Sequence, residues 1–336
     1  MGKGKALRDG GRGLAVFQTR ITEMFGIKYP IIQGAMMWLS RAEMVAAVAN
    51  AGGLGIMAAL TFPTAKELRE EIKKTKSLTD KPFAVNITLL PTIRPRSLEE
   101  YIDAAIEEGV TIIETAGRNP RQYMKQLREG GVKVMHKVAS VKAAKTAERI
   151  GVDAVTIVGF EEGGNPGMDD VTTLILVPRA VDALDIPVIA GGGIGDGRGL
   201  VAALALGAEG VLMGTRFMLS QESPLHPNIK QRLLEATEKD TLMIMRSINN
   251  PERVVTTNFA RRVLEMEEKG TSLEELLPMI DGRRQKQALD KGAADEAMIP
   301  CGQVVGLIND LPTIKEIIDG IIKEARIIGK RLSEGG

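Results

Sequence analysis

Cysteine and histidine are scarce in this chain of 336 residues, which contains only Cys301, His136 and His226. One cysteine excludes an intrachain disulfide and a cysteine-based zinc site, and two histidines leave little for a histidine-based metal centre. We therefore expect no metal site and a reducing, cytoplasmic environment. Aromatic residues make up only 3% of the chain, which is too few for the stacking platforms that bind single-stranded nucleic acid.

Excess charge and long apolar runs are also missing. The 44 basic and 43 acidic residues leave a net charge of +1, so no general attraction to nucleic acid or to an anionic membrane is expected. No apolar run approaches the ~18 residues that a membrane-spanning helix needs. The basic, Gly-rich N-terminus lacks the continuous apolar core of a signal peptide, and we expect residues 1–16 to be a disordered basic extension.

Short apolar runs alternate with amphipathic helical patterns over the first two thirds of the chain. Eight such pairs predict an α/β fold, a (β/α)8 TIM barrel over residues 17–222. An open doubly wound sheet is the alternative. The even spacing, and the absence of a strict G-x-G-x-x-G motif after the first strand, favour the barrel. The predicted strands lie within residues 30–35, 54–59, 83–90, 111–117, 132–139, 153–159, 186–192 and 210–217.

The strand–helix repeat ends near residue 222, and the sequence beyond it has helical periodicity. We expect residues 223–300 to form a smaller helical domain on the substrate side of the barrel. Residues 301–336 are expected to contain a C-terminal helix that packs back on the barrel. The clearest helical patterns cover residues 228–245, 260–270 and 311–332.

Glycine is concentrated after the seventh and eighth predicted strands. The stretch "VIAGGGIGDGRG" (188–199) contains Gly192 and Gly193, and Gly214 and Thr215 follow the eighth strand. Glycine lets backbone N–H groups approach an anion, and the loops after strands seven and eight often bind phosphate in TIM barrels. The pattern therefore predicts a phosphate cradle. A tight turn that needs positive φ would explain one glycine, but not the run.

Polar side chains at other strand ends suit a flat polar ring. Asn86 can donate and accept hydrogen bonds, and Lys137 can place a positive charge where a reduced flavin gathers negative charge. Small residues in "QGAMMW" (33–38) let the backbone meet a ring. Structural alternatives remain open: Asn86 as a turn cap, Lys137 as a solvated strand end, and the methionines as core packing. We interpret His136 and Cys301 as structural residues.

Several segments, taken together and in order, resemble the nitronate monooxygenase family, formerly called 2-nitropropane dioxygenases. The similarity extends over about residues 17–332. That family includes FMN-dependent NAD(P)H:quinone reductases, and flavin-dependent enoyl-acyl-carrier-protein reductases are its relatives. The motifs "RAEMVAAVANAGG", "NITLLPT" and "DGRGLVAALALGA" look most similar to the quinone-reductase branch. The segments are "PIIQGAMMWLSRAEMVAAVANAGGLG", "FAVNITLLPT", "HKVASVKAAKTAERIGVDAV", "GFEEGGNPG", "IPVIAGGGIGDGRGLVAALALGAEGVLMGTRF" and "HPNIKQ".

The resemblance implies a non-covalent FMN at the barrel mouth, and it also implies a homodimer. By position it assigns the flavin ring to the loop after strand one and the polar edge of the ring to strands three and five. The sixth loop approaches the ring, and the seventh and eighth loops hold the phosphate. The residues implied are Gly34, Ala35, Met36, Asn86, Lys137, Gly163, Gly164, Gly192, Gly193, Gly214 and Thr215.

The sequence departs from the family pattern in the loop "GFEEGGNPG" (159–167). Many relatives carry histidine there, in a "GHxG" pattern beside the flavin, whereas this chain has Asn165. Histidine takes a proton near neutral pH and an amide does not. Asn165 can still donate a hydrogen bond to an anionic oxygen. We therefore assign Asn165 a hydrogen-bonding role only, and Lys137 is the second residue expected at the reacting centre.

The resemblance implies an FMN-dependent oxidoreductase that oxidises alkyl nitronates with O₂. A nitronate is already deprotonated, so its oxidation does not need a base at position 165, and neither does the reduction of a quinone by reduced flavin. The alternative is an NAD(P)H:quinone reductase, with NADH or NADPH as co-substrate. An enoyl-acyl-carrier-protein reductase and a non-enzymatic flavin-binding module are weaker alternatives. The two prolines of "LLPTIRP" (89–95) fit either a loop that gates the flavin or an ordinary rigid loop.

Overall fold

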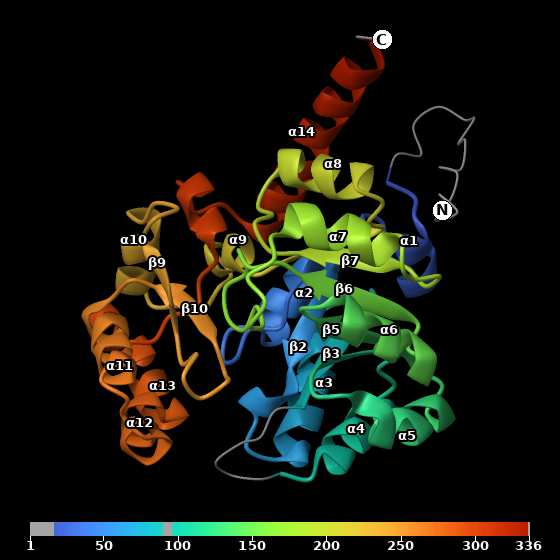
Figure 1. Ribbon diagram of the computed structural model, residues 1–336. Coiled ribbons are helices and arrows are strands. Elements are labelled where there is room, and N and C mark those ends of the chain that lie inside the picture. Colours follow the sequence, from blue (N-terminus) through green and yellow to red (C-terminus); the bar gives the residue numbers. More distant parts are fainter. Residues whose placement is uncertain (1–16, 90–95, 335–336) are drawn as a thin grey trace.

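Eight parallel strands close into a barrel in sequence order in the computed structural model (Figure 1), which describes residues 17–89 and 96–334. The first strand pairs with both the second and the eighth, so the predicted TIM barrel is confirmed. The expected N-terminal extension, and all of the predicted gating loop except its first residue, lie outside the described residues. The strands are β1 (Ile31–Gln33), β2 (Leu54–Ala58), β3 (Ala84–Leu89), β4 (Ile112–Gly117), β5 (Lys133–Val138), β6 (Ala154–Val158), β7 (Val188–Gly191) and β8 (Gly210–Met213).

Helices cover the outside of the barrel, and hydroxyl or carboxylate side chains cap several of them. Ser97 and Ser140 accept hydrogen bonds from backbone N–H groups at the starts of two helices, and Thr64 forms a capping box with Glu67. The helices of the barrel are α1 (Arg20–Phe25), α2 (Ala42–Asn50), α3 (Ala65–Leu78), α4 (Leu98–Glu107), α5 (Met124–Glu129), α6 (Val141–Ile150), α7 (Thr173–Val181), α8 (Gly197–Ala205) and α9 (Thr215–Met218), with 3₁₀ turns η1 (Ala59–Thr61) and η2 (Pro120–Tyr123).

The interior of the barrel changes from apolar to polar along the strands. The layers near the amino ends of the strands form one buried apolar cluster, which includes Ala84, Ile112 and Met135. Ile21 of α1 belongs to the same cluster. Side chains alternate along a strand, so the residue two positions further on points into the same interior. On β3, β4 and β5 those residues are Asn86, Glu114 and Lys137. The polar layer therefore lies at the carboxyl ends of the strands, where TIM barrels carry their active sites.

A second lobe follows the barrel (Figure 1), and two apolar clusters form its core. Between its first two helices the chain forms a pair of antiparallel strands. The elements are α10 (Pro227–Leu234), β9 (Thr241–Ile244), β10 (Glu252–Val255), α11 (Asn258–Glu268), α12 (Leu273–Ile280), α13 (Gly282–Asp290), η3 (Ala294–Glu296) and η4 (Gln303–Leu307).

The prediction of one helix over residues 228–245 was wrong. The helix ends at Leu234, and a turn follows in which the Asp240 carboxylate accepts hydrogen bonds from the backbone and side chain of Thr237, each at 2.8 Å. Leu242 then pairs with Val254 across the two strands. The β-branched residues of the second strand favour this pairing. The first strand is a short apolar run, and periodicity alone does not distinguish such a run from part of a helix.

The last helix, α14 (Ile314–Glu334), returns to the barrel and lies beside α8 (Figure 1). Ile314, Ile318 and Ile322 join the layer of side chains between the helices and the sheet. Gly197 allows the two helices to approach, because a Cβ there would lie 2.7 Å from the backbone nitrogen of Ala325. No helix among the described residues is both long and apolar enough to cross a membrane.

Candidate active site

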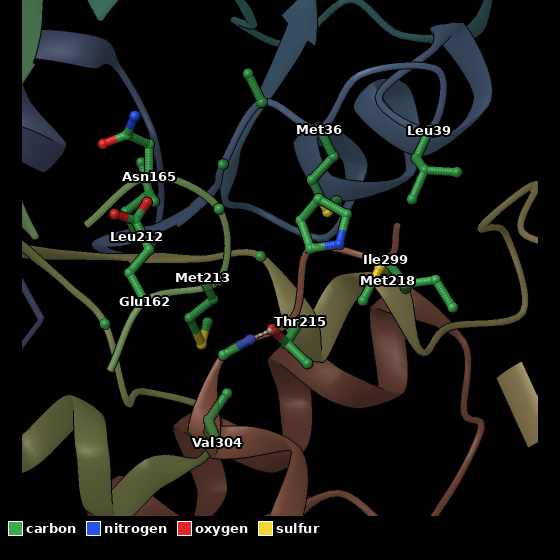
Figure 2. A pocket seen from close by; sticks show the side chains of 18 of the residues that line it. Met36, Leu39, Glu162, Asn165, Leu212, Met213, Thr215, Met218, Ile299 and Val304 are labelled. Carbon is green, nitrogen blue, oxygen red and sulfur yellow. Dashed lines mark hydrogen bonds between the residues drawn. The ribbon is translucent and has the colours of Figure 1, made fainter. Parts of the chain in front are cut away.

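The loops at the carboxyl ends of the strands enclose a cavity of about 260 Å³ together with the second lobe (Figure 2). This volume is just below the range typical of ligand pockets, about 300–1,000 Å³. All but one of the predicted site residues line it: Gly34, Ala35, Met36, Lys137, Gly163, Gly164, Asn165, Gly192, Gly193, Gly214 and Thr215. Sequence reasoning did not single out several other lining residues, among them Glu162, Leu225, Glu252, Leu289, Ile299 and Pro300.

The loops after β7 and β8 form one end of this cavity. Gly192 and Gly193 have φ values of 96° and 70°, in the left-handed region that favours glycine. A Cβ on Gly192 would also lie 3.1 Å from the backbone of Gly159. A Cβ on Gly214 would have only the Met36 sulfur nearby, at 3.9 Å, so the absence of a side chain leaves open space there. These glycines leave backbone exposed along a concave surface, as a phosphate cradle requires.

The start of α8 does not serve this cradle as an anion-binding end. Asp196 caps the helix by accepting a hydrogen bond from the Gly199 N–H at 3.1 Å. The Gly197 N–H donates to the Glu324 carboxylate of α14 at 2.7 Å. Two carboxylates therefore occupy the positive end of the helix dipole. The helix dipole is thus not available to a phosphate in the cavity, and the glycine loops remain for it.

Two charged side chains meet in the wall of the cavity, Lys137 from the polar layer and Glu162 from the loop after β6. The Lys137 ammonium donates to the Glu162 carboxylate at 3.1 Å. Burial raises the pKa of both Glu162 and Glu114, and the charge of Lys137 opposes this rise. Burial alone would lower the pKa of Lys137, but Glu162 and Glu114 outweigh it, so that pKa is raised. Lys137 therefore keeps its positive charge beside the cavity.

Asn86 does not line the cavity, which differs from its predicted contact with a ligand. Its side-chain N–H donates to the Glu114 carboxylate at 2.5 Å, and its side-chain oxygen accepts from the Thr88 hydroxyl at 2.8 Å. Asn86 pairs with Glu114 in register across β3 and β4. Its amide group therefore forms hydrogen bonds inside the barrel. Like Asn86 and Lys137, Glu114 lies two residues after an inward-facing apolar residue of its strand. This alternation could have identified Glu114 from the sequence.

A model of the family described as nitronate monooxygenase matches residues 18–324 of this chain. The chain belongs to the nitronate monooxygenase family.

Relatives within and around the nitronate monooxygenase family match over nearly their whole length. A (3aS,4S,5R,7aS)-5-hydroxy-7a-methyl-1-oxo-octahydro-1H-indene-4-carboxyl-CoA dehydrogenase from Rhodococcus jostii is 36% identical, over 93% of this chain and 97% of the relative. A probable nitronate monooxygenase from Staphylococcus saprophyticus is 32% identical, over 93% and 99%. The structure of FabK from Thermotoga maritima aligns with a TM-score of 0.89 and 38% identity, over 95% and 99%. Nitronate monooxygenases and FabK are FMN enzymes.

Asn165, at the position of the histidine in many nitronate monooxygenases, links two loops. Its side-chain N–H donates to the Asn250 side-chain oxygen at 3.0 Å, and its own oxygen accepts from the Gly167 N–H at 3.2 Å. The amide thus ties the loop after β6 to the turn before β10 while it lines the cavity. Asn165 lines the same cavity as the other predicted site residues, and a second N–H hydrogen of its amide remains for a ligand.

Glu252 is a further titratable residue of the cavity wall, and no motif or periodicity in the sequence pointed to it. It lies on β10 of the second lobe, far from the barrel motifs in sequence. Burial raises the pKa of Glu252 to about 7, Lys137 opposes the rise, and Glu162 adds to it. The site therefore contains a carboxyl group that exchanges protons near neutral pH.

The single cysteine and the two histidines of this chain take no part in the chemistry proposed for the cavity. His136 is buried, its Nδ1 lies 2.8 Å from the Thr115 hydroxyl oxygen, and burial lowers its pKa to about 4. His226 caps α10 by accepting a hydrogen bond from the Asn228 N–H. Burial raises the pKa of Cys301 to about 12, so its thiol stays protonated and unreactive.

Proposed function

We propose that the chain is an FMN-dependent oxidoreductase that acts on the carbon–carbon bond next to the carbonyl of an acyl thioester. The observation that carries this proposal is the apolar wall of the cavity, to which both the barrel loops and the second lobe contribute and which suits the apolar part of an acyl thioester. The wall consists of Met36, Trp38, Leu39, Met218, Leu225, Leu289, Ile299 and Pro300. The carboxyl-CoA dehydrogenase from Rhodococcus jostii supports it, because that relative aligns over 97% of its length.

FMN fits the residues that line the cavity. The left-handed Gly192 and Gly193, with Gly214, would hold its phosphate. Gly34 and Ala35 leave room along its ring, and the Lys137 ammonium lies at the polar end of the cavity. One Glu162 oxygen, Oε2, is buried without a hydrogen-bond partner among the described residues. A bound polar group would satisfy it. When bound, FMN supplies a two-electron acceptor and donor.

Basic residues lie next to the mouth end of the apolar wall. The first residue of α13, Gly282, is close to Trp38, since a Cβ on it would lie 3.8 Å from the indole ring. Arg283 and Arg284 follow it on the surface of the protein. Guanidinium groups bind phosphates, so these residues suit the phosphate-bearing carrier of an acyl thioester.

Nitronate oxidation with O₂ is the second candidate. The probable nitronate monooxygenase from Staphylococcus saprophyticus supports it. The spare N–H of Asn165 and the ammonium of Lys137 suit the oxygens of a nitronate anion. The NAD(P)H:quinone alternative stays a prediction from sequence motifs.

Anaerobic flavin spectroscopy tests these proposals on the holoenzyme. We expect acyl-CoA esters to bleach the flavin band near ~450 nm, where oxidised flavin acting as the hydride acceptor absorbs. We also expect a 2-enoyl-CoA to restore the yellow colour of photoreduced enzyme. The matching free acid and CoA alone are the controls. Thioesters without effect in either direction, with bleaching by propyl-2-nitronate, would replace the proposal with the second candidate. Bleaching by NADH or NADPH alone would favour the quinone reductase.

A further inference from the structure

We propose that the Glu252 carboxyl group transfers the proton to and from substrate carbon, in place of the histidine that Asn165 replaces. This inference rests on the proposed function and names a residue for it. In the oxidative direction, the Glu252 carboxylate would take a proton from the carbon next to the thioester carbonyl. The neighbouring carbon would lose a hydride to oxidised FMN, and a carbon–carbon double bond would form. In the reductive direction, the same carboxyl group returns its proton to carbon.

The backbone holds Glu252 beside the loop that carries Asn165. Gly164 and Arg253 form an isolated antiparallel bridge. The Gly164 N–H donates to the Arg253 carbonyl at 3.0 Å, and the Arg253 N–H donates to the Gly164 carbonyl at 2.7 Å. A Cβ on Gly164 would lie 3.9 Å from Glu252 Oε2. The carboxyl group therefore lies next to the position of the family histidine, and both side chains line the cavity.

Glu252 is also the cavity carboxylate that has no other partner. Among the described residues, no hydrogen bond or ion pair engages its side chain, which is partly exposed. The other two carboxylates of the cavity are committed. Glu161 accepts hydrogen bonds from the backbone and hydroxyl of Thr173 at 3.0–3.1 Å, and Glu162 accepts from Lys137. Glu162 keeps one oxygen, Oε2, without a partner, but its other oxygen holds the Lys137 ammonium. Glu252 is therefore the cavity carboxylate with neither oxygen engaged among the described residues.

The charges around Glu252 keep both of its protonation states accessible. Lys137 of β5 favours the carboxylate, whereas Glu162 of the loop after β6 favours the protonated acid. Glu161 lies on the same loop, and Glu114 of β4 lies deeper in the barrel. Arg253, the next residue, does not pair with Glu252. Its guanidinium donates to the Phe160 carbonyl and to the Thr241 hydroxyl, each at 3.0 Å.

The experiment compares Glu252→Gln with the wild-type holoenzyme. Glutamine keeps the size and the hydrogen-bonding atoms of the side chain but cannot exchange a proton. The first readout is exchange of the substrate C–H next to the thioester carbonyl with D₂O, followed by mass spectrometry without turnover. The second is a carboxyl infrared band that titrates near pH 7. We expect E252Q to slow exchange by about 10²–10⁴-fold and to abolish the infrared titration, with FMN content unchanged.

Two further variants separate a proton-transfer role from a structural one. E252Q combined with Asn165→His should recover part of the exchange, because a titratable group returns to the adjacent position. Glu268→Gln, an exposed residue of α11, should exchange at the wild-type rate. Wild-type exchange rates in E252Q, or an infrared titration that survives in it, would overturn the role of Glu252 alone. A wild-type enzyme that exchanges no acyl thioester would overturn the proposed function and this role together.

Discussion

Lys137→Met is expected to destabilise the folded protein by about 2–3 kcal/mol at pH 8 and to abolish tight FMN binding. Removing one partner of a buried ion pair typically costs about 3–5 kcal/mol, since the remaining charge is left uncompensated. A quarter of the Lys137 side chain is exposed, and solvent screening reduces the expected loss. Urea unfolding gives the free energy, and flavin fluorescence gives the affinity.

The defect of Lys137→Met should depend on pH in a defined direction. Burial already raises the pKa of Glu162 and Glu114 in the folded state, and loss of the ammonium raises both further. A carboxyl group with a raised pKa in the folded state favours folding at low pH, and this contribution is lost as pH rises through the folded pKa. The variant should therefore be closer to the wild type at pH 5 than at pH 8. Equal losses at both pH values would contradict the role of these carboxylates.

Two variants complete this test. Glu162→Gln in the Lys137→Met background removes the uncompensated carboxylate and should restore part of the stability at pH 8, without restoring FMN affinity. Lys133→Met removes a lysine from the same strand that pairs with Asp153 at 2.9 Å, with half of its side chain exposed. Exposed pairs contribute about 0–1 kcal/mol, so this control should retain both FMN and stability.

Gly163→Ala is expected to reduce FMN affinity at least about tenfold and to lower the free energy of unfolding by about 3 kcal/mol. A Cβ at Gly163 would lie 2.5 Å from the Gly302 nitrogen and 2.6 Å from the Cys301 carbonyl carbon. Backbone atoms cannot turn aside as a flexible side chain does, and overpacking typically costs about 1–3 kcal/mol. The displaced segment carries Pro300 and Gly302 of the cavity wall, so the flavin site changes with it. Isothermal titration of the apoenzyme with FMN measures the affinity.

Gly131→Ala separates this clash from the general cost of replacing glycine. Gly131 has a φ of 68°, and a Cβ there would have no heavy atom within 4 Å. Its replacement should cost only about 1 kcal/mol of backbone strain and leave FMN affinity unchanged. A Gly163→Ala protein that binds FMN like this control would show that the cavity wall tolerates displacement.

The TIM barrel could be predicted from the sequence because the patterns that indicate it are local. Each strand–helix pair is a short run followed by a helical period, and eight of them in series determine a closed parallel sheet. The glycine loop after β7 was equally readable, because the left-handed φ values of Gly192 and Gly193 leave few choices other than glycine. By contrast, the hydrogen bond between Asn86 and Glu114 could not be predicted, since the cross-strand register decides which polar groups of neighbouring strands meet.

Sequence alone thus determined the fold class, the family and most of the barrel residues around the cavity, because these depend on patterns within a few tens of residues. The tertiary structure decided which titratable side chains lie close enough together to shift one another's pKa. Glu252 reaches the cavity only because β10 bridges to Gly164, 88 residues earlier in the chain. Burial in this cavity raises its pKa, the charge of Lys137 lowers it, and the charge of Glu162 raises it further, although both residues come from other elements. Electrostatic coupling depends on distance in space, and local sequence periodicity does not contain that distance.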